Sequence, residues 1–256
     1  MTSANRFVWY ELMTSDLPAA ATFYTGVLGW DIRDAGMPDF DYRLASSAGG
    51  MRAGLMGTPS EAQGMPPFWS GYVGVTDVEE MSDRLKAAGG AVHRPATDIP
   101  GVGRFAVVAD PQGAIFCLFQ PNDGTDGSGP PAPEDEAGTV GWQELYAEDM
   151  PAVTGFYETL FGWRLDTLMD MGEMGGYQIF LQKDDVPGGM MTRPAAVPRP
   201  CWQYYFRVSA LDAAAARITE GGGTVLMGPH LVPGDTWVLQ ATDPQGAHFG
   251  LLSASR

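Results

Sequence analysis

Cysteine, histidine and basic residues are scarce in this chain. The two cysteines, Cys117 and Cys201, have a spacing that fits neither a disulfide framework nor a zinc-binding motif, so both are expected to act as small buried hydrophobic residues. The 15 Lys and Arg residues against 31 Asp and Glu residues give a formal net charge of −16. This charge disfavours nucleic acid and anionic membranes as partners, because both bind basic patches. It would favour a cationic ligand; the alternative is that the charge serves only the solubility of the surface.

Long apolar runs are also lacking. No stretch approaches the roughly 20 apolar residues that a membrane-spanning helix needs. The first residues, MTSANRFVWY, lack the basic segment followed by an apolar segment that a secretory signal requires. We therefore expect a soluble, cytoplasmic protein with a substantial core, since 45% of its residues are hydrophobic.

The second half of the chain repeats the sequence pattern of the first half. At an offset of 133 positions, many residues of the first half coincide with identical residues of the second half. The matches include Trp9 with Trp142, Glu11 with Glu144, Asp16 with Asp149, Tyr24 with Tyr157, Trp69 with Trp202, Tyr72 with Tyr205, and Asp-Pro-Gln-Gly at 110–113 with 243–246. In the middle of each half the offset becomes 135, as for Tyr42 with Tyr177 and Met56 with Met191. This pattern indicates that a whole domain was duplicated.

The segment between the two copies, residues 121–139, is rich in Gly, Pro and acidic residues, which is typical of a linker. We therefore predict one domain over residues 1–120 and a second over residues 140–256. They are called the first and the second repeat below.

Each repeat is predicted to contain two modules of one strand, one helix and three strands. In the first repeat the helices are expected to begin at Asp16-Leu17-Pro18 and after a capping box of Thr76 and Glu79. The Asp-Pro-Gln-Gly tetrapeptide suits a type I turn, so we expect no chemical role for it. The predicted strands of the first repeat are 7–12, 30–35, 41–46, 50–56, 68–75, 91–93, 103–109 and 114–120.

The order of these motifs, from Asp-Leu-Pro through Phe-Tyr and Val-Leu-Gly-Trp to Val-Thr-Asp-Val-Glu and Asp-Pro-Gln-Gly, resembles the vicinal oxygen chelate superfamily. That group includes glyoxalase I, extradiol dioxygenases and bleomycin resistance proteins. The resemblance covers both repeats and implies an α+β fold of two tandem glyoxalase-like domains, each with two βαβββ modules that form an open cup. It also implies that one chain imitates the usual dimer, so we expect a monomer or a weak homodimer.

The resemblance further implies where metal ligands would project into the cups. These positions fall on Trp9, Ser70 and Cys117 in the first repeat and on Trp142, Gln203 and Gly250 in the second. A divalent metal in this fold needs three or four ligands such as His, Glu or Gln around one centre. We therefore expect no metal and no other cofactor. A divalent metal held by His248, Glu144 and Gln203 remains as an alternative.

Each repeat places a Trp and a Glu on one face of its first strand, because residues two apart in a strand project to the same side. These pairs are Trp9 with Glu11 and Trp142 with Glu144. A carboxylate among aromatic groups is expected to have a raised pKa, which suits proton transfer or ligand binding. The alternative is structural: a carboxylate that accepts hydrogen bonds from the backbone or from tyrosine to close the sheet.

From these features we predict a glyoxalase- and bleomycin-resistance-like protein that binds small, partly aromatic or cationic molecules without a metal. One alternative is an enzyme of lyase, isomerase or hydroxylase type that uses a metal in the second cup, or Glu11 and Glu144 as general bases. Another is an interaction protein whose cups are filled by its own side chains. The predicted ligand-binding residues are Trp9, Ser70, Tyr72, Cys117, Trp142, Gln203 and Tyr205.

Overall fold

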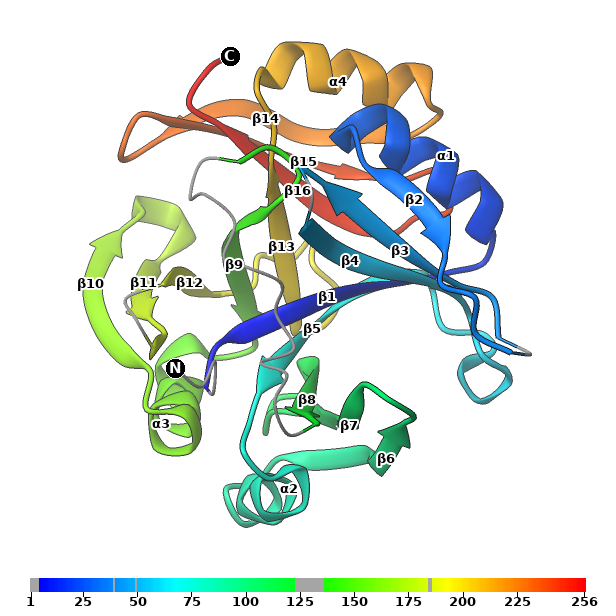
Figure 1. Ribbon diagram of the computed structural model, residues 1–256. Helices are drawn as coiled ribbons and strands as arrows, with labels where there is room; N and C mark the ends of the chain where they lie inside the picture. The colour runs from blue at the N-terminus through cyan, green and yellow to red at the C-terminus, as the bar shows by residue number, and fades with distance from the viewer. Residues whose placement is uncertain (1–4, 39, 49, 123–135, 184–185) are drawn as a thin grey trace. The chain divides into compact units, whose positions relative to one another are not determined.

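Figure 1 shows the computed structural model of the chain, which describes residues 5–256 except 39, 49, 123–135 and 184–185. Most of the predicted linker therefore lies outside the described residues. One strand, one helix and three strands follow one another four times along the chain, with short 3-10 helices between some of them. The predicted α+β class and the four βαβββ modules are confirmed.

In its described residues the first repeat contains ten α-helices and β-strands. Its β6 is longer than the predicted 91–93, because β6 pairs with β7 through two register shifts that let the ladder continue past Pro95. The elements are β1 (Phe7–Thr14), α1 (Leu17–Leu28), β2 (Asp31–Asp34), β3 (Tyr42–Ser47), β4 (Gly50–Gly57), β5 (Phe68–Gly74), α2 (Val78–Ala87), β6 (Ala91–Ile99), β7 (Gly103–Ala109) and β8 (Ile115–Pro121).

The second repeat has the same order of elements. They are β9 (Val140–Ala147), α3 (Met150–Phe161), β10 (Arg164–Asp170), β11 (Gly176–Leu181), β12 (Pro187–Thr192), β13 (Cys201–Arg207), α4 (Leu211–Glu220), β14 (Thr224–Val232), β15 (Thr236–Thr242) and β16 (His248–Ser253). None of the helices within the described ranges is long and apolar enough to cross a membrane.

Local sequence explains where the helices begin and end. Asp16 caps α1 with its side chain, and Gly29 ends the helix in the left-handed conformation with φ of 71°. The equivalent residues cap α3. The predicted cap of α2 is wrong by one residue, since Asp77 rather than Thr76 accepts the hydrogen bond. Asp77 has the extended backbone conformation of an N-cap residue (φ −147°, ψ 115°), which directs its carboxylate to the free N–H groups of the first turn.

Each repeat forms one eight-stranded sheet. The strand order is β2-β3-β4-β1-β5-β8-β7-β6 in the first repeat and β10-β11-β12-β9-β13-β16-β15-β14 in the second. The first strand of each module pairs in parallel with the last strand of the same module, for example β9 with β12. In each sheet the first strand, β1 or β9, lies at the junction between the two modules. This strand carries the Trp and the Glu of its repeat.

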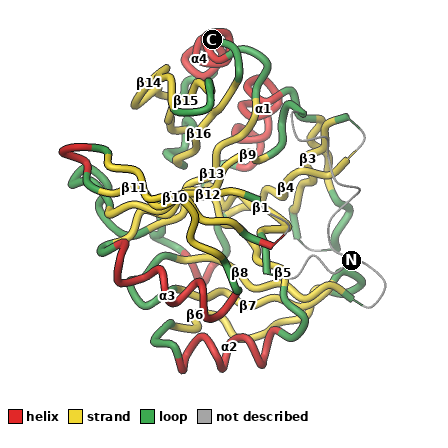
Figure 2. Tube along the Cα trace, turned by 90° about the vertical axis from the view of Figure 1, so that its left-hand side faces the viewer, coloured by secondary structure: helices red, strands yellow, loops and turns green. Residues whose placement is uncertain are grey.

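Contacts divide the chain into two compact units that cross the repeats. Unit 1 contains Met1–Trp9, Ser70–Ser128 and Trp142–Gln203, and unit 2 contains Tyr10–Trp69, Gly129–Gly141 and Tyr204–Arg256. Unit 1 thus combines the second module of the first repeat with the first module of the second repeat. Unit 2 combines the first module of the first repeat with the second module of the second repeat. Within unit 1, α2 and α3 lie side by side (Figure 2), and within unit 2, α1 contacts α4.

A buried tyrosine and a buried aspartate from different repeats meet in each unit. In unit 1, the Tyr157 hydroxyl donates to Asp110 Oδ2 at 2.9 Å, and Trp202 Nε1 donates to the tyrosine oxygen at 3.3 Å. Asp110 Oδ1 accepts the backbone N–H groups of Gln112 and Ala114. Unit 2 repeats the arrangement with Trp69, Tyr24 and Asp243. The Asp-Pro-Gln-Gly turn, expected only to reverse the chain, therefore also joins the two repeats.

Aromatic rings pack around each of these hydrogen bonds. In unit 1, Trp163 stacks on Tyr157 with ring centroids 5.1 Å apart and on Phe180 at 4.8 Å, and Trp202 meets Tyr157 edge-on. Such pairs contribute about 0.5–1.5 kcal/mol each beyond the area that they bury. The ring packing excludes water from the Tyr–Asp bond, so the carboxylate depends on its protein partners.

The pKa values of Asp110 and Asp243 make stability depend on pH. Burial raises both above the ordinary 3.8, although hydrogen bonds from the backbone and from tyrosine oppose the rise. Between the unfolded and the native pKa values, the two carboxyls therefore stay protonated in the native state and are ionised in the unfolded state. The stabilisation that these protons provide is complete below about pH 4 and is lost as pH rises through the raised pKa values. We expect the free energy of unfolding, from urea titrations, to fall less steeply above pH 4 in the Asp110→Asn, Asp243→Asn double variant than in the unaltered protein.

The matched control is Asp83→Asn, because the Asp83 side chain is 75% exposed. It should leave the slope of unfolding free energy against pH unchanged. If the double variant also kept the original slope, the two buried carboxyls would not be the titrating groups.

Candidate functional site

A chain of three side chains lies in unit 1. The Tyr177 hydroxyl donates to Glu144 Oε1 at 2.8 Å, and Trp142 Nε1 donates to the tyrosine oxygen at 2.9 Å. Glu144 is only 6% exposed. In unit 2, the Tyr42 hydroxyl likewise donates to Glu11 Oε2 at 2.8 Å. The structure thus contains the tyrosine hydrogen bonds of the structural alternative, while ligand binding by the two glutamates remains a prediction.

A glycine lets each tyrosine reach its glutamate. Tyr177 lies on β11 and Glu144 on β9, and the strand between them, β12, places Gly189 opposite Glu144. A Cβ on Gly189 would collide with the Tyr177 hydroxyl, and Gly54 stands in the same relation to Tyr42. Our sequence reasoning missed both tyrosines as site residues. The signal was the offset of 135, at which the Tyr and the Gly recur together.

The Tyr177 phenol is a permanent donor at neutral pH. Burial, the charge of Glu144 and the hydrogen bond to it raise the pKa of Tyr177 well above 10. The hydroxyl therefore stays protonated and orients the carboxylate, and the indole N–H of Trp142 orients the hydroxyl in turn.

The predicted ligand-binding residues of the first repeat meet in a hydrophobic cluster of unit 1. Tyr72 and Cys117 are buried and are direct partners in the register of β5 and β8, and Trp9 packs against them. The Ser70 hydroxyl lies 3.6 Å from Cys117 Sγ, so these two groups satisfy each other. Both cysteines are free thiols; Cys117 is buried as expected, whereas Cys201 is only partly buried. Burial raises the pKa of Cys201 to about 11, which keeps that thiol protonated.

Gln203 and Cys201 share one face of β13 in unit 1. Trp202, between them, packs edge-on against Tyr157, so strand alternation directs its two neighbours to the opposite face. Phe180 of β11 packs against Trp202, so strand alternation directs Tyr177, and the Glu144 that it bonds, to the face of Gln203 and Cys201. Gln203 is 5% exposed, and its Nε2 has no hydrogen-bond partner among the residues that the structure describes.

The remaining predicted residues lie in unit 2. The ring of Tyr205 covers Gly250, where a Cβ would collide with it, and Gln240 Nε2 donates to the Tyr205 hydroxyl at 2.6 Å. His248 is an exposed residue at the start of β16. Partial burial of the imidazole lowers the pKa of His248 from 6.5, opposed by the charge of Asp243. The imidazole is therefore neutral at pH 7.

The side chains at the implied metal positions do not fit a divalent ion. Across the described part of the chain, no group of three or more His, Cys, Asp or Glu residues is placed to hold one. Gly250 offers no ligand atom, Trp142 uses its N–H on Tyr177, and Ser70 is bonded to Cys117. The alternative set of His248, Glu144 and Gln203 contains only two residues of those four types, and it remains a prediction.

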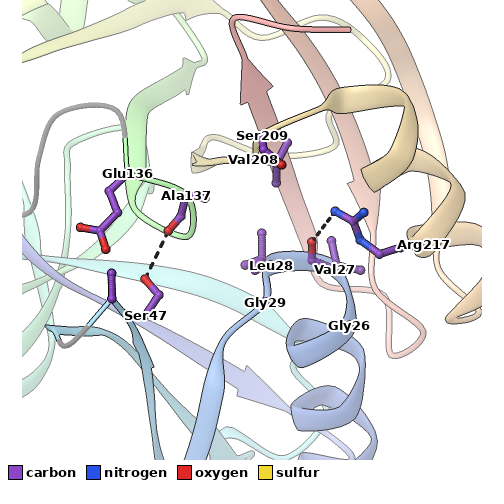
Figure 3. Close-up of a pocket in the computed structure, with 11 residues that line it drawn as sticks. Gly26, Val27, Leu28, Gly29, Ser47, Glu136, Ala137, Val208, Ser209 and Arg217 are labelled. Carbon is purple, nitrogen blue, oxygen red and sulfur yellow. Dashed lines mark hydrogen bonds between the residues drawn. The ribbon is translucent and has the colours of Figure 1, made fainter.

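A pocket of about 400 Å³ lies in unit 2 at the C-terminal end of α1 (Figure 3). Arg217 donates to the Val27 carbonyl at 3.2 Å, and the Ser47 hydroxyl donates to the Ala137 carbonyl at 3.2 Å across its wall. None of the residues that the sequence predicts for the site lines it. Because Arg217 and Ser47 bond to backbone carbonyls and Glu136 Oε2 is paired with Arg52, we assign this pocket no ligand.

The close approach of Tyr177 and Gly189 generates a test. Gly189→Ala should lower the free energy of unfolding by about 1–3 kcal/mol, because the new methyl group displaces the tyrosine and leaves the buried Glu144 without that donor. Gly155→Ala is the control, since nothing lies within 4 Å of a Cβ at this position in α3. That change should raise stability by up to about 1 kcal/mol. Chemical denaturation of both variants measures the difference, and equal effects would contradict the assigned role of Gly189.

Comparison with known proteins agrees with this architecture. Over 247 residues the chain is 33% identical to the Mycobacterium tuberculosis protein named "Putative glyoxylase CFP32". The alignment covers 95% of this chain and 93% of that protein. It is 31% identical over 261 residues to the anthracycline biosynthesis protein DauV of Streptomyces sp. (strain C5), with 95% and 91% covered.

Solved structures share the fold at low sequence identity. The Mn(II)-bound glyoxalase of Novosphingobium aromaticivorans superposes with a TM-score of 0.68 at 14% identity, covering 100% of this chain and 84% of that one. The 2,3-dioxygenase LapB of Pseudomonas sp. KL28 superposes with a TM-score of 0.66 at 16% identity, covering 100% and 94%. A family model matches residues 6–118 and again residues 139–251. The chain therefore belongs to the Glyoxalase/Bleomycin resistance protein/Dioxygenase superfamily, with two repeats of its domain.

Proposed function

We propose that this protein binds a small aromatic molecule, without a metal ion, on the face of unit 1 that carries Trp142, Glu144 and Tyr177. The observation that carries the proposal is the hydrogen-bonded chain of these three side chains. It holds a partly exposed indole and a buried carboxylate in one orientation. An aromatic surface beside a few oriented polar groups is typical of small-molecule sites.

The relatives support an aromatic ligand. DauV is named as an anthracycline biosynthesis protein, and anthracyclines as a chemical class are oxygenated polycyclic aromatic compounds. Trp142 offers a ring on which such a compound stacks. The net charge of −16 favours ligands that carry an amine, because a protein field of one sign raises the local concentration of the opposite charge.

Binding of doxorubicin, a fluorescent cationic anthracycline, tests the proposal. We expect saturable binding in fluorescence titrations and at least a tenfold loss of affinity in Trp142→Leu, since base-sized aromatic stacking contributes about 1–3 kcal/mol. Trp237→Leu is the control, because Trp237 is a partly buried tryptophan of β15 that packs against Arg256. Affinity that is equal in the two variants, or absent from the unaltered protein, would contradict the proposal.

The absence of a metal requirement is tested separately. We expect no stoichiometric divalent ion by elemental mass spectrometry of protein purified without a metal-affinity tag and incubated with zinc, nickel, iron and manganese. One ion per chain, lost in His248→Ala, would instead favour the metal-dependent enzyme alternative.

A further inference from the structure

We propose that Gln203 donates a hydrogen bond to the ligand, and that the site therefore selects aromatic ketones and quinones over aromatic hydrocarbons of the same shape. This inference rests on the proposed function. It names the chemical class that the face of unit 1 recognises.

The amide of Gln203 is exceptional among the buried glutamines of unit 1. Gln182 donates to Gln143 Oε1 at 3.1 Å and accepts the backbone N–H of Phe7 at 2.8 Å. Gln178 donates to the carbonyl of Ile179 at 2.7 Å. Gln203 is buried to the same degree, yet its Nε2 has no partner within the described residues. A buried amide without a partner destabilises the free protein, so its presence requires an explanation.

The position of Gln203 supplies that explanation. Strand β13 is the neighbour of β9 in the sheet, and Gln203 lies on the same face as Tyr177 and Glu144, opposite to Trp202 and Phe180. The counterpart of Gln203 in the first repeat is Ser70, a shorter side chain whose hydroxyl is satisfied by Cys117. The unsatisfied amide therefore belongs to the second repeat, and the two repeats are not equivalent.

The chemistry of the surrounding groups narrows the ligand. The indole N–H of Trp142 already donates to Tyr177, so only the face of the indole ring is left to contact the ligand. The amide of Gln203 offers an N–H, which pairs with a carbonyl oxygen in the plane of the ring system. An anionic acceptor such as a carboxylate is disfavoured by the neighbouring Glu144. A neutral or cationic aromatic compound with a ring carbonyl satisfies all of these groups.

Two probes that differ by one oxygen test the selection. 9-Fluorenone carries a ring carbonyl and fluorene does not, and each is titrated as a competitor against bound doxorubicin. We expect the unaltered protein to prefer fluorenone by roughly tenfold, the equivalent of one hydrogen bond. In Gln203→Met this preference should vanish while fluorene keeps its affinity. A preference that survives in Gln203→Met would overturn the inference and leave the proposed function intact. Failure of doxorubicin to bind the unaltered protein would overturn both.

Thermal unfolding without ligand gives an independent readout. Gln203→Met removes a buried amide that has no partner, so Tm should rise on the order of 2–4 °C. Gln178→Met removes a buried amide that is bonded to two backbone carbonyls, so Tm should fall. A fall in Tm for Gln203→Met would show that its amide is satisfied in the free protein, and would overturn the inference.

Discussion

The hydrogen bond between a buried tyrosine and a buried aspartate of the other repeat is the interaction on which the rest of this structure depends. Removing a carboxylate from water is costly, and the aspartate tolerates it because it accepts two backbone N–H groups and a phenol in addition. The tyrosine comes from a helix and the aspartate from a turn of a different repeat. Each unit is therefore assembled from halves of two repeats, and duplication supplied both partners twice.

A second tyrosine in each repeat holds the glutamate of the candidate site. Tyr177 crosses β12 to hold Glu144, and it does so only because Gly189 leaves the space above that strand open. Duplication preserved this tyrosine, its glycine and its glutamate in both repeats. The adjoining strand has diverged: Ser70 is bonded to Cys117 in one repeat, and in the other the Gln203 Nε2 has no partner in the described part of the chain. We interpret the shared part as support for the sheet and the divergent part as the determinant of what binds.

Much of the fold was predictable because its determinants are local. Asp16 and Gly29 begin and end α1 through their own backbone and side-chain geometry, and the same residues recur at α3. The predicted element boundaries were wrong where adjacent residues compete to cap a helix, or where pairing with another strand sets the length of a strand. Asp77 replaced Thr76 as a cap, and β6 extended beyond its predicted end because β7 offered it partners. The roles of the predicted site residues stay predictions, and the tyrosine that holds each glutamate was missed, since it lies two strands away.

The sequence by itself determined that the chain is a duplicated α+β protein of this superfamily, because repeats, caps and turns are written in short stretches of residues. It also determined that histidine is too scarce at the expected positions for the usual ligand set. The tertiary structure was needed to show that Tyr157 meets Asp110, that Tyr177 meets Glu144, and that the Gln203 Nε2 finds no hydrogen-bond partner among the described residues. Those facts depend on strand register and on which module packs against which. Both are set by contacts between residues far apart in the chain, which no local pattern encodes.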